Sequence, residues 1–504
     1  MLEISAKEVL SRLEFDNPWW SDPVSQHVEF SDKPRRKYFP LFLKQVTDRS
    51  VRRAVVLMGP RRVGKTVMVY HAIHSLLEDN FDSKRILYLS LETPLYTGMA
   101  LERMLKMYLD FHGLSRREQI YVFFDEVQYL RDWEVHLKSL VDSYPEFKFT
   151  VTGSAAAALR LKSNESGAGR FSNFTLPPLT FAEYLQFIGR EKELIQCIEG
   201  GRNPEYHCLD IGALNLEFMR YLNFGGYPEA VFSETVQNNP AQYIKSDIID
   251  KVLLRDLPSL YGINDIQELN RLFTVLAYNT GNEVSLEELS KSAGVAKNTI
   301  KKYLEYLEAA FLIVRVERID NNARRFKRAM CFKVYLTNPS MRAALFGNIS
   351  DDMEGIGNLV ETAIFSQWQH SESSSLYYAR WATGEIDIVS LLDKEQIPLW
   401  ATEIKWTDRA TKDYSALRHC VEFAELNPRL LQPILCTTLT VDSHTTYKGV
   451  DFVFKPASLH AYRLGANLLR AKSEFDGAIT VNKTMAALAR QENKAKKIAQ
   501  TDVD

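Results

Sequence analysis

The chain has 504 residues, of which 45% are hydrophobic and 25% are charged, and its formal net charge is −2. That composition is typical of a globular protein, and a chain of this length is expected to fold into about three domains. The near-neutral charge excludes a protein that binds nucleic acid through its overall field, so any such binding must come from local basic patches.

No apolar run approaches the roughly 18 residues that a membrane span requires. The first residues, MLEISAKEVL, are too acidic for a signal peptide. The five cysteines form no C-x-x-C pair, which favours reduced thiols over a zinc site or a disulfide framework. We therefore expect a cytoplasmic protein with no membrane partner.

The first motif along the chain is GPRRVGKT at Gly59–Thr66, which fits the pattern G-x-x-x-x-G-K-[ST] of a phosphate-binding loop. Ala54–Met58 before it is predicted to be a buried strand, and Val67–Leu77 after it a helix. In that context main-chain N–H groups and the Lys65 ammonium hold phosphate oxygens, and the Thr66 hydroxyl ligates Mg²⁺. We expect ATP and Mg²⁺ as cofactors, bound by Gly59, Pro60, Arg61, Arg62, Val63, Gly64, Lys65 and Thr66.

A second nucleotide-binding signature is the apolar run Ile120–Glu126, which ends in two acids. Asp125 is expected to hold the water shell of Mg²⁺, and Glu126 to act as the catalytic general base on the attacking water. Arg85–Leu91 and Lys148–Ser154 are also predicted strands. Strands that alternate with helices predict a mostly parallel sheet, with helices on both faces and the ligand at the carboxyl ends of the strands.

Three further side chains are candidates for contact with the nucleotide. Thr152 or Ser154 either senses the γ-phosphate or caps a helix at Ala155–Leu161. Arg170, in the run Gly167–Arg170, is either an arginine finger, acting within one subunit or across two, or a surface residue. We include Thr152 and Arg170 among the predicted cofactor-binding residues.

Six segments in order make the chain similar to a family of bacterial and archaeal AAA-type P-loop ATPases that carry an uncharacterised C-terminal domain. The segments are Asn17–Trp20 (NPWW), Gly59–Thr66 (GPRRVGKT), Phe123–Gln128 (FFDEVQ), Thr152–Ser154 (TGS), Gly169–Phe171 (GRF) and Phe224–Glu229 (FGGYPE). The resemblance implies an AAA-type core that binds ATP, and it leaves the substrate open.

Residues 180–280 are predicted to be mostly helical, and a helix-turn-helix pattern follows them. Ser285 and Glu288 form a capping box for a helix that ends at Gly294, and Lys297–Leu307 begins the next helix. The strand Phe311–Arg318 completes the order helix, turn, helix, strand, which is typical of a winged helix.

Two functions of this module remain open. In one, the leading end of the second helix enters the major groove of DNA; in the other, the module is a lid on the ATPase core. The basic run Arg324–Arg328 is a further candidate for phosphate contact, and a second basic run, Lys33–Lys37, has a use that the sequence leaves open. The helix residues that would read DNA are Lys297, Asn298, Thr299, Lys301 and Lys302.

The C-terminal part places acids on a helix and on a strand. Glu361 lies off the apolar stripe of a helix at Ile356–Trp368. The alternating strand around Gly384–Val389 puts Ile386 and Ile388 on one face, so Asp387 is predicted to point to the other.

A third piece is the strand Trp400–Trp406, in which Glu403 and Lys405 are two residues apart and therefore project to the same side. The order Glu, Asp, Glu-x-Lys resembles the restriction-endonuclease-like PD-(D/E)xK fold, with an isoleucine where that pattern has proline. The resemblance implies that Asp387 and Glu403 bind Mg²⁺, that Lys405 positions or activates the water, and that Glu361 is an outer ligand or orienter.

These predictions give an α/β chain in six parts. They are an N-terminal arm (1–35), an AAA-type P-loop ATPase core (36–180), a helical region (181–280), a winged helix-turn-helix (281–337), an α/β restriction-endonuclease-like domain (338–470) and a polar tail (471–504).

The leading functional hypothesis is an ATPase coupled to a Mg²⁺-dependent DNA-cleaving domain, with DNA as partner and a homo-oligomer as an open question. By analogy with prokaryotic proteins of this build, a role in defence against foreign DNA or in mobile-element biology is expected. Two alternatives remain: an ATP-dependent switch that only grips DNA or a protein, and a STAND-type signalling ATPase that oligomerises with the winged helix as its latch.

Overall fold

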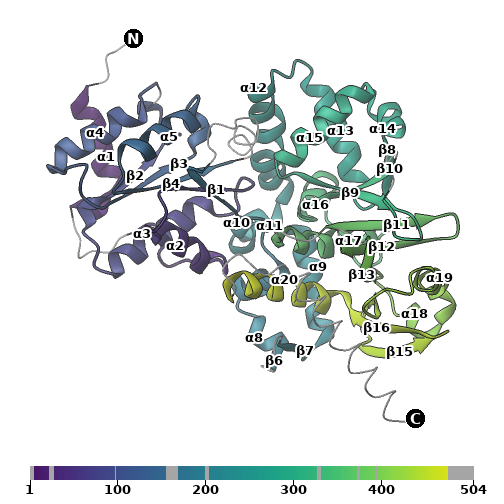
Figure 1. The fold of residues 1–504 in the computed structure, drawn as a ribbon. Coiled ribbons are helices and arrows are strands. Elements are labelled where there is room, and N and C mark those ends of the chain that lie inside the picture. Colours follow the sequence, from purple (N-terminus) through teal and green to yellow (C-terminus); the bar gives the residue numbers. More distant parts are fainter. Residues whose placement is uncertain are drawn as a thin grey trace. The chain divides into compact units, whose positions relative to one another are not determined.

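The computed structural model describes residues 5–21, 28–96, 98–154, 169–198, 204–325, 331–371, 375–392 and 396–474 (Figure 1). The chain forms two compact units where about three domains were expected. Unit 1 comprises Met1–Pro177, Leu254–Ile263 and Ala309–Phe311, and unit 2 comprises Pro178–Leu253, Asn264–Glu308 and Leu312–Asp504.

Unit 1 is built on a parallel sheet with the strand order β2-β3-β4-β1-β5. Its strands are β1 (Ala54–Met58), β2 (Ile86–Ser90), β3 (Ile120–Asp125), β4 (Phe147–Gly153) and β5 (Phe171–Thr175). Helices cover both faces of the sheet (Figure 1), namely α1 (Ala6–Asp16), α2 (Phe39–Thr47), α3 (Lys65–Glu78), α4 (Leu101–His112) and α5 (Trp133–Ser143). The predicted parallel sheet and its strand–helix alternation are confirmed.

The NPWW segment joins the N-terminal helix to the edge strand β2. The Asn17 side chain donates to Tyr88 O at 2.9 Å and accepts from Tyr88 N at 2.7 Å, which satisfies main-chain groups on the strand's open edge. The Trp20 indole N–H donates to Ile86 O at 2.8 Å. The predicted N-terminal arm (1–35) therefore contributes to unit 1 rather than extending from it.

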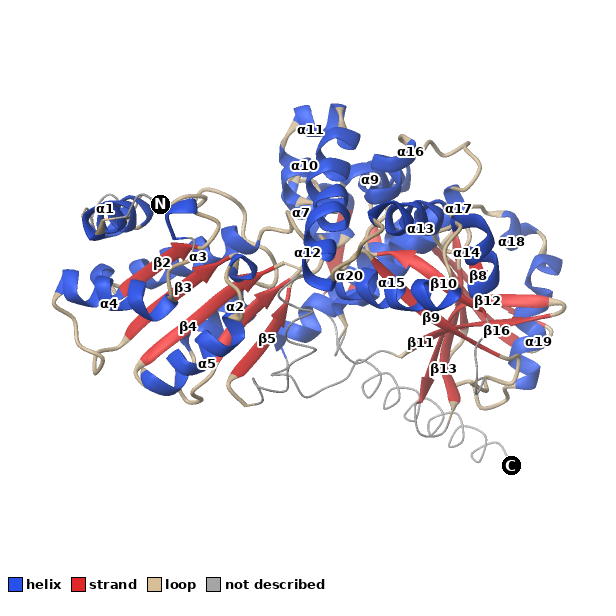
Figure 2. Cartoon of the chain, turned by 90° about the horizontal axis from the view of Figure 1, so that it is seen from above, coloured by secondary structure: helices blue, strands red, loops and turns tan. Residues whose placement is uncertain are grey.

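Unit 2 contains a mixed sheet with the order β15-β16-β14-β13-β12-β11-β9-β10-β8 (Figure 2 colours the strands red). Strands β11, β12 and β13 form an antiparallel meander, and β14 then pairs with β13 in parallel. The strands are β8 (Glu283–Ser285), β9 (Ile313–Ile319), β10 (Cys331–Leu336), β11 (Leu376–Trp381), β12 (Gly384–Leu392), β13 (Ile397–Glu403), β14 (Ile434–Thr438), β15 (Ser443–Tyr447) and β16 (Val450–Pro456).

Helices and a small hairpin, β6 (Ile195–Ile198) with β7 (Glu205–Cys208), complete unit 2. Its main apolar core lies where α17, α20, α7 and α9 meet the sheet, and a second core lies under α19. The helices include α7 (Phe181–Phe187), α8 (Glu191–Leu194), α9 (Ile211–Phe224), α10 (Pro228–Phe232), α11 (Glu234–Asn238), α13 (Ile266–Tyr278), α14 (Leu286–Ala293), α15 (Lys297–Ala309), α16 (Ser340–Phe346), α17 (Ile356–Gln367), α18 (Arg409–Lys412), α19 (Arg418–Leu426) and α20 (Ala457–Glu474).

Two predicted domain boundaries do not separate structural units. Strand β9 pairs with β11 in parallel, with Tyr377 opposite Glu317, so the strands predicted for a winged helix and those of the C-terminal domain share one sheet. The predicted break between residues 337 and 338 therefore lies inside unit 2. The segment Leu254–Ile263, which carries α12 (Leu257–Tyr261), belongs to unit 1 although it was predicted within the helical region.

Among the described residues, no helix has both the length and the apolar character that crossing a membrane demands.

Candidate functional sites

The loop after β1 has the shape that phosphate binding requires. Gly64 has φ 92°, a conformation that glycine adopts without strain, and it leads directly into α3. A Cβ on Gly59 would lie 2.2 Å from Leu176 O, because Leu176 N donates to Met58 O at 2.7 Å and holds that segment against the loop. Only glycine fits at position 59, so the first glycine of the motif has a packing reason as well as a ligand reason.

Lys65 is the buried cation of this site. Its ammonium donates to Pro60 O at 2.8 Å and to Gly59 O at 3.2 Å, and the residue is 4% exposed. Burial lowers the pKa of Lys65 from its usual value. A charge held by neutral carbonyls can exchange them for phosphate oxygens without breaking an ion pair, which suits a site that receives an anion.

Asp125 at the end of β3 collects three hydroxyl donors. Thr66 Oγ1 donates to Asp125 Oδ2 at 2.8 Å and the Tyr88 hydroxyl donates to the same oxygen at 3.0 Å, while Thr152 Oγ1 donates to Oδ1. Burial and the neighbouring Glu126 raise the pKa of Asp125 to about 6. Hydroxyl and carboxylate oxygens from two elements thus meet beside the loop, a donor set that fits Mg²⁺.

Thr152 contacts both acids, because its strand β4 lies next to β3, which ends at Asp125. Its Oγ1 also accepts from Glu126 N at 3.0 Å, and Glu126 has φ 58°. The Glu126 carboxylate accepts from Gln128 Nε2, and Gln128 Oε1 accepts from Ser154 N at 3.2 Å. The helix predicted at Ala155–Leu161 lies outside the described residues, so the choice between a γ-phosphate contact and a helix cap stays open for both hydroxyls.

Arg61 in the loop has a carboxylate partner that the sequence did not indicate. Its Nε and Nη2 each lie 3.0 Å from an oxygen of Asp256, in the segment Leu254–Ile263 of unit 1. Arg36, from the basic run Lys33–Lys37, is buried and donates to Val63 O at 2.8 Å and to Pro177 O at 3.0 Å. Arg36 therefore supports the loop from within unit 1.

Arg170 does not reach the nucleotide site of its own chain. It precedes Phe171, which pairs with Ala54 at the amino end of β1, whereas the P-loop follows the carboxyl end of that strand. Its side chain forms an ion pair with Asp142 at 2.8 Å. The prediction of Arg170 as a cofactor-binding residue within one subunit is therefore wrong; an action across two subunits stays a prediction.

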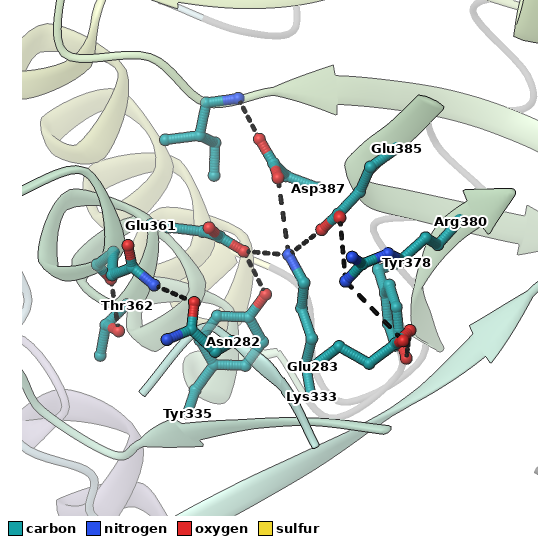
Figure 3. A network of polar contacts seen from close by, with 12 residues as sticks. Asn282, Glu283, Lys333, Tyr335, Glu361, Thr362, Tyr378, Arg380, Glu385 and Asp387 are labelled. Atoms are coloured by element: carbon teal, nitrogen blue, oxygen red, sulfur yellow. Dashed lines mark hydrogen bonds and ion pairs between the residues drawn. The ribbon is translucent and has the colours of Figure 1, made fainter. Parts of the chain in front are cut away.

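In unit 2 the three acids Glu361, Asp387 and Glu403 converge, and the ammonium groups of Lys405 and Lys333 link them. The Lys405 ammonium lies 2.6 Å from Glu403 Oε1 and 3.9 Å from Asp387 Oδ2. The Lys333 ammonium lies 2.8 Å from Glu361 Oε1 and 3.5 Å from Asp387 Oδ1 (Figure 3). We call the four acids Glu361, Glu385, Asp387 and Glu403, together with Lys333 and Lys405, the acidic cluster.

The strand that carries Asp387 departs from the alternation that was predicted. Tyr377 pairs with Val389 and Ala379 pairs with Ile386, so two residues of β12 stand opposite Tyr378 alone. This bulge changes the side to which the following residues point. Ile386 packs in the core under α19 and Ile388 in the main core, so the expectation that they share a face is wrong.

The strand β13 ends at Glu403, and Lys405 lies just beyond it rather than within a strand that continues to Trp406. Thr437 replaces the ladder there: its Oγ1 accepts from Lys405 N at 2.7 Å and donates to Lys405 O at 2.8 Å. Ile404 N donates to Asp387 Oδ2 at 2.8 Å. The backbone after the strand thus fixes one carboxylate and places Lys405 beside it.

A divalent cation fits one end of the acidic cluster. Glu403 is 4% exposed, and its Oε2 has no hydrogen-bond partner among the described residues, which is costly unless a ligand satisfies it. Its other oxygen accepts from His419 Nε2 at 3.0 Å. Asp387 and Glu403 are the residues that would hold Mg²⁺. The Lys405 side chain is 43% exposed, so this end faces solvent.

Glu361 is buried in α17, and burial raises its pKa to about 7 although the Lys333 ammonium opposes that rise. The Tyr335 hydroxyl donates to Glu361 Oε1 at 2.5 Å. Sequence reasoning missed Lys333, Tyr335 and Glu385. A signal existed, since one lysine interrupts the apolar run CFKVYL of β10, and a buried lysine needs a partner.

Comparison with protein families finds two matches. Residues 51–185 match an AAA domain, and residues 215–352 match a domain of unknown function (DUF8612). The second match contains Lys333 and ends before Glu361, so most of the acidic cluster lies outside both.

Two similar proteins are named only as uncharacterized proteins. One from Methanocaldococcus jannaschii is 24% identical over 372 residues, which covers 70% of this chain and 76% of that protein. Another, from Haemophilus influenzae, is 25% identical over 310 residues, covering 60% and 72%.

Among solved structures, the Aeropyrum pernix Orc1 protein in complex with DNA is 13% identical, with a TM-score of 0.28 over 65% of this chain and 96% of that one. AMPPCP-bound DnaA from Aquifex aeolicus is 12% identical, with a TM-score of 0.29 over 56% and 91%. Such low TM-scores do not say what this chain does. The family match and the geometry of the loop agree, and residues 51–185 form an AAA-type P-loop ATPase domain.

Proposed function

We propose that the chain is an ATP-hydrolysing AAA-type ATPase coupled to a Mg²⁺-dependent site in unit 2 that cleaves DNA. The observation that carries the proposal is the convergence of Glu361, Asp387, Glu403 and Lys405, which come from a helix, two strands and the segment just after the second strand. The elements α17, β11, β12, β13, α18, α19 and β14 follow in this order: a helix, three antiparallel strands, two helices and a parallel strand. This order supports the resemblance to a restriction-endonuclease-like fold.

The chain's own residues divide the work of cleavage. A bound Mg²⁺ would supply charge neutralisation and a water of lowered pKa. Asp387 is oriented by Ile404 N, and Glu403 is held by His419 and Lys405. Lys405 is half exposed, so its ammonium can contact a phosphodiester and position the attacking water.

At the nucleotide site, Lys65 exchanges main-chain carbonyls for β- and γ-phosphate oxygens, and Thr66 with Asp125 would hold Mg²⁺. Glu126 orients the attacking water as general base. Asp125 and Glu126 are both tied to Thr152, so a change at the γ-phosphate reaches β4 directly. We infer that ATP binding and hydrolysis gate cleavage in unit 2.

A winged helix made of α13, α14, α15, β8, β9 and β10 is proposed to hold the DNA. Ser285 Oγ accepts from Glu288 N at 3.1 Å, and Gly294 ends α14 with φ 68°. The leading end of α15 is open to solvent, with Lys297, Asn298, Lys301 and Lys302 exposed. In the basic run after β9, Arg324 and Arg325 are exposed, while residues 326–328 lie outside the described residues.

Plasmid cleavage tests the proposal. With Mg²⁺ and ATP, the wild-type chain is expected to nick or linearise plasmid DNA, and Asp387→Ala to lose this activity while it keeps ATP hydrolysis. Asp351→Ala, at an exposed acid outside the cluster, is the matched control and should cleave like wild type. Equal cleavage by wild type and Asp387→Ala would show that the activity comes from elsewhere.

A second candidate is an ATP-dependent module that grips DNA without cutting it. The specific observation in its favour is the Lys333 ammonium, which already neutralises part of the carboxylate charge that a cation would meet. Under this alternative Mg²⁺ leaves the DNA intact, Asp387→Ala binds DNA as wild type does, and the double variant Lys301→Ala with Lys302→Ala releases it.

A further inference from the structure

Lys333 is the most enclosed charge of the acidic cluster. It lies on β10 with its side chain 3% exposed. Its ammonium contacts three carboxylates, namely Glu361 at 2.8 Å, Glu385 at 2.5 Å and Asp387 at 3.5 Å (Figure 3). An ammonium has three N–H donors, so each has an acidic acceptor within reach.

An aromatic ring, a tyrosine hydroxyl and an arginine surround the Lys333 ammonium and its carboxylate partners. Its Nζ lies 5.4 Å from the centre of the Tyr378 ring, and Tyr335 donates to the same oxygen of Glu361 that Lys333 contacts. Arg380 lies 3.6 Å from the second oxygen of Glu385 and keeps that carboxylate in position. Moving the charged group away would leave it without acidic partners beside aromatic rings, and a buried charge without a partner strongly destabilises the folded state.

Asp387 divides the cluster into two ends. Its Oδ1 contacts the Lys333 ammonium, which also contacts Glu361 and Glu385. Its Oδ2 accepts from Ile404 N and lies 3.9 Å from the Lys405 ammonium. The buried end is filled by the Lys333 ammonium. The open end has the unpartnered Glu403 Oε2 and the half-exposed Lys405.

We propose that the Lys333 ammonium stands permanently where a second cation would bind, so that the acidic cluster takes a single divalent cation, held by Asp387 and Glu403. This inference rests on the proposed cation site of the cleavage function. A second divalent ion at Glu361 and Glu385 would have to share a few ångströms with a fixed positive charge, and that repulsion excludes it. Lys333 is thus a positioning residue that sets the number of metal ions.

Counting bound Mn²⁺ tests the inference without any DNA. The full chain, free of nucleotide, is titrated with Mn²⁺ by calorimetry, with free Mn²⁺ followed by electron paramagnetic resonance. Asp387→Asn is the reference that subtracts the P-loop and adventitious ions. The expected difference from this reference is one ion for wild type and two for Lys333→Met.

The double variant Lys333→Met with Glu361→Gln controls for a general loosening of the site. It lacks the ammonium and also one carboxylate of the buried end, so it should return to one ion. A count of two for wild type, or one for a folded Lys333→Met, overturns the inference. Two ions bound to the double variant overturn it as well, because they would not depend on the Glu361 carboxylate.

Lys333→Met removes a buried charge and can prevent folding, but the inference can still be tested in a chain that unfolds. If a cation replaces the ammonium, a Lys333→Met chain that is unfolded alone must fold when Mn²⁺ is supplied, and its melting temperature must rise with Mn²⁺ more than that of wild type. A Lys333→Met chain that stays unfolded with Mn²⁺ overturns the inference.

Failure here is distinguishable from failure of the proposed function. Two ions in a wild-type chain that cleaves plasmid would remove the inference and keep the nuclease. One ion in a chain that cleaves no DNA under any nucleotide state would do the reverse. No ion above the Asp387→Asn reference would contradict both.

Discussion

Two buried lysines, Lys65 in unit 1 and Lys333 in unit 2, show how one residue type serves opposite sites. Lys65 is held by main-chain carbonyls and burial lowers its pKa, whereas three carboxylates hold the pKa of Lys333 well above its usual range although burial opposes this. The P-loop therefore has a cation waiting for an anion. The acidic cluster has carboxylates in excess, of which one part is already neutralised.

The difference teaches where each site is complete. Around Lys65 the missing charge is the polyanion, so ligand binding improves the electrostatics of the folded state. Around Lys333 the ion pairs are closed, and what remains open is the Asp387–Glu403 end with its unpartnered oxygen. Lys65 therefore serves ligand binding, and Lys333 serves the stability of the folded chain.

The largest expected effect is a loss of stability when Lys333, the lysine that the fold requires, is replaced. Lys333→Met leaves three carboxylates facing one another in a buried site and should lower the free energy of unfolding by about 3–5 kcal/mol in metal-free buffer. Lys65→Met removes only bonds to neutral carbonyls and should change it by about 1 kcal/mol. Urea unfolding of both variants, with the exposed Lys412→Met as control, measures the contrast; equal losses would refute it.

Lys65→Ala tests the role of Lys65 in ATP hydrolysis. Removal of the ammonium that meets the developing phosphate charge should lower the rate of ATP hydrolysis about 10²–10³-fold. A phosphate-release assay measures this, and Lys84→Ala, at an exposed lysine of the same unit, should leave the rate unchanged. Retention of wild-type turnover in Lys65→Ala would show that hydrolysis does not use the loop.

A pH dependence sharpens the comparison at Glu361, whose pKa is raised to about 7 from 4.5. The folded chain binds this proton more tightly than the unfolded chain, so its contribution to stability is greatest below about pH 4.5 and is lost as the pH rises through 7. Glu361→Gln should flatten the fall in unfolding free energy between pH 5 and 7 by on the order of 1–3 kcal/mol. Parallel slopes for wild type and variant would contradict the assignment.

The smallest expected effect concerns Arg61 and Asp256. Asp256→Asn weakens the paired contacts at 3.0 Å and frees the guanidinium for phosphate, so ATP should bind a few times more tightly, about threefold. Fluorescent-nucleotide titration measures the dissociation constant. Adding Arg61→Ala should cancel the gain, and a gain that persists would place its cause elsewhere.

The residues predicted around the P-loop lie together in the structure because they are contiguous or end successive parallel strands. Partners from distant segments, such as Asp256 beside Arg61, left no local pattern. Arg170 was misplaced because a Gly-rich run does not reveal to which end of a sheet it leads.

In unit 2 the spacing of Glu403 and Lys405 predicted that the two side chains project to the same side, and in the structure the Lys405 ammonium lies 2.6 Å from Glu403 Oε1. The alternation around Asp387 failed, because a bulge inserts a residue that no periodic pattern reveals. Lys333 comes from a strand 28 positions before Glu361 and belongs to no motif, so only its place in an apolar run indicated it.

The most direct test of the account is a crystal structure of the full chain grown with Mn²⁺ and a non-hydrolysable ATP analogue, with anomalous scattering used to locate manganese. The account predicts a triphosphate on Lys65 with one ion beside Thr66 and Asp125, and one ion between Asp387 and Glu403 while Lys333 keeps its three carboxylates. Anomalous density at Glu361 and Glu385 with Lys333 displaced, or none at Asp387 and Glu403, would contradict it.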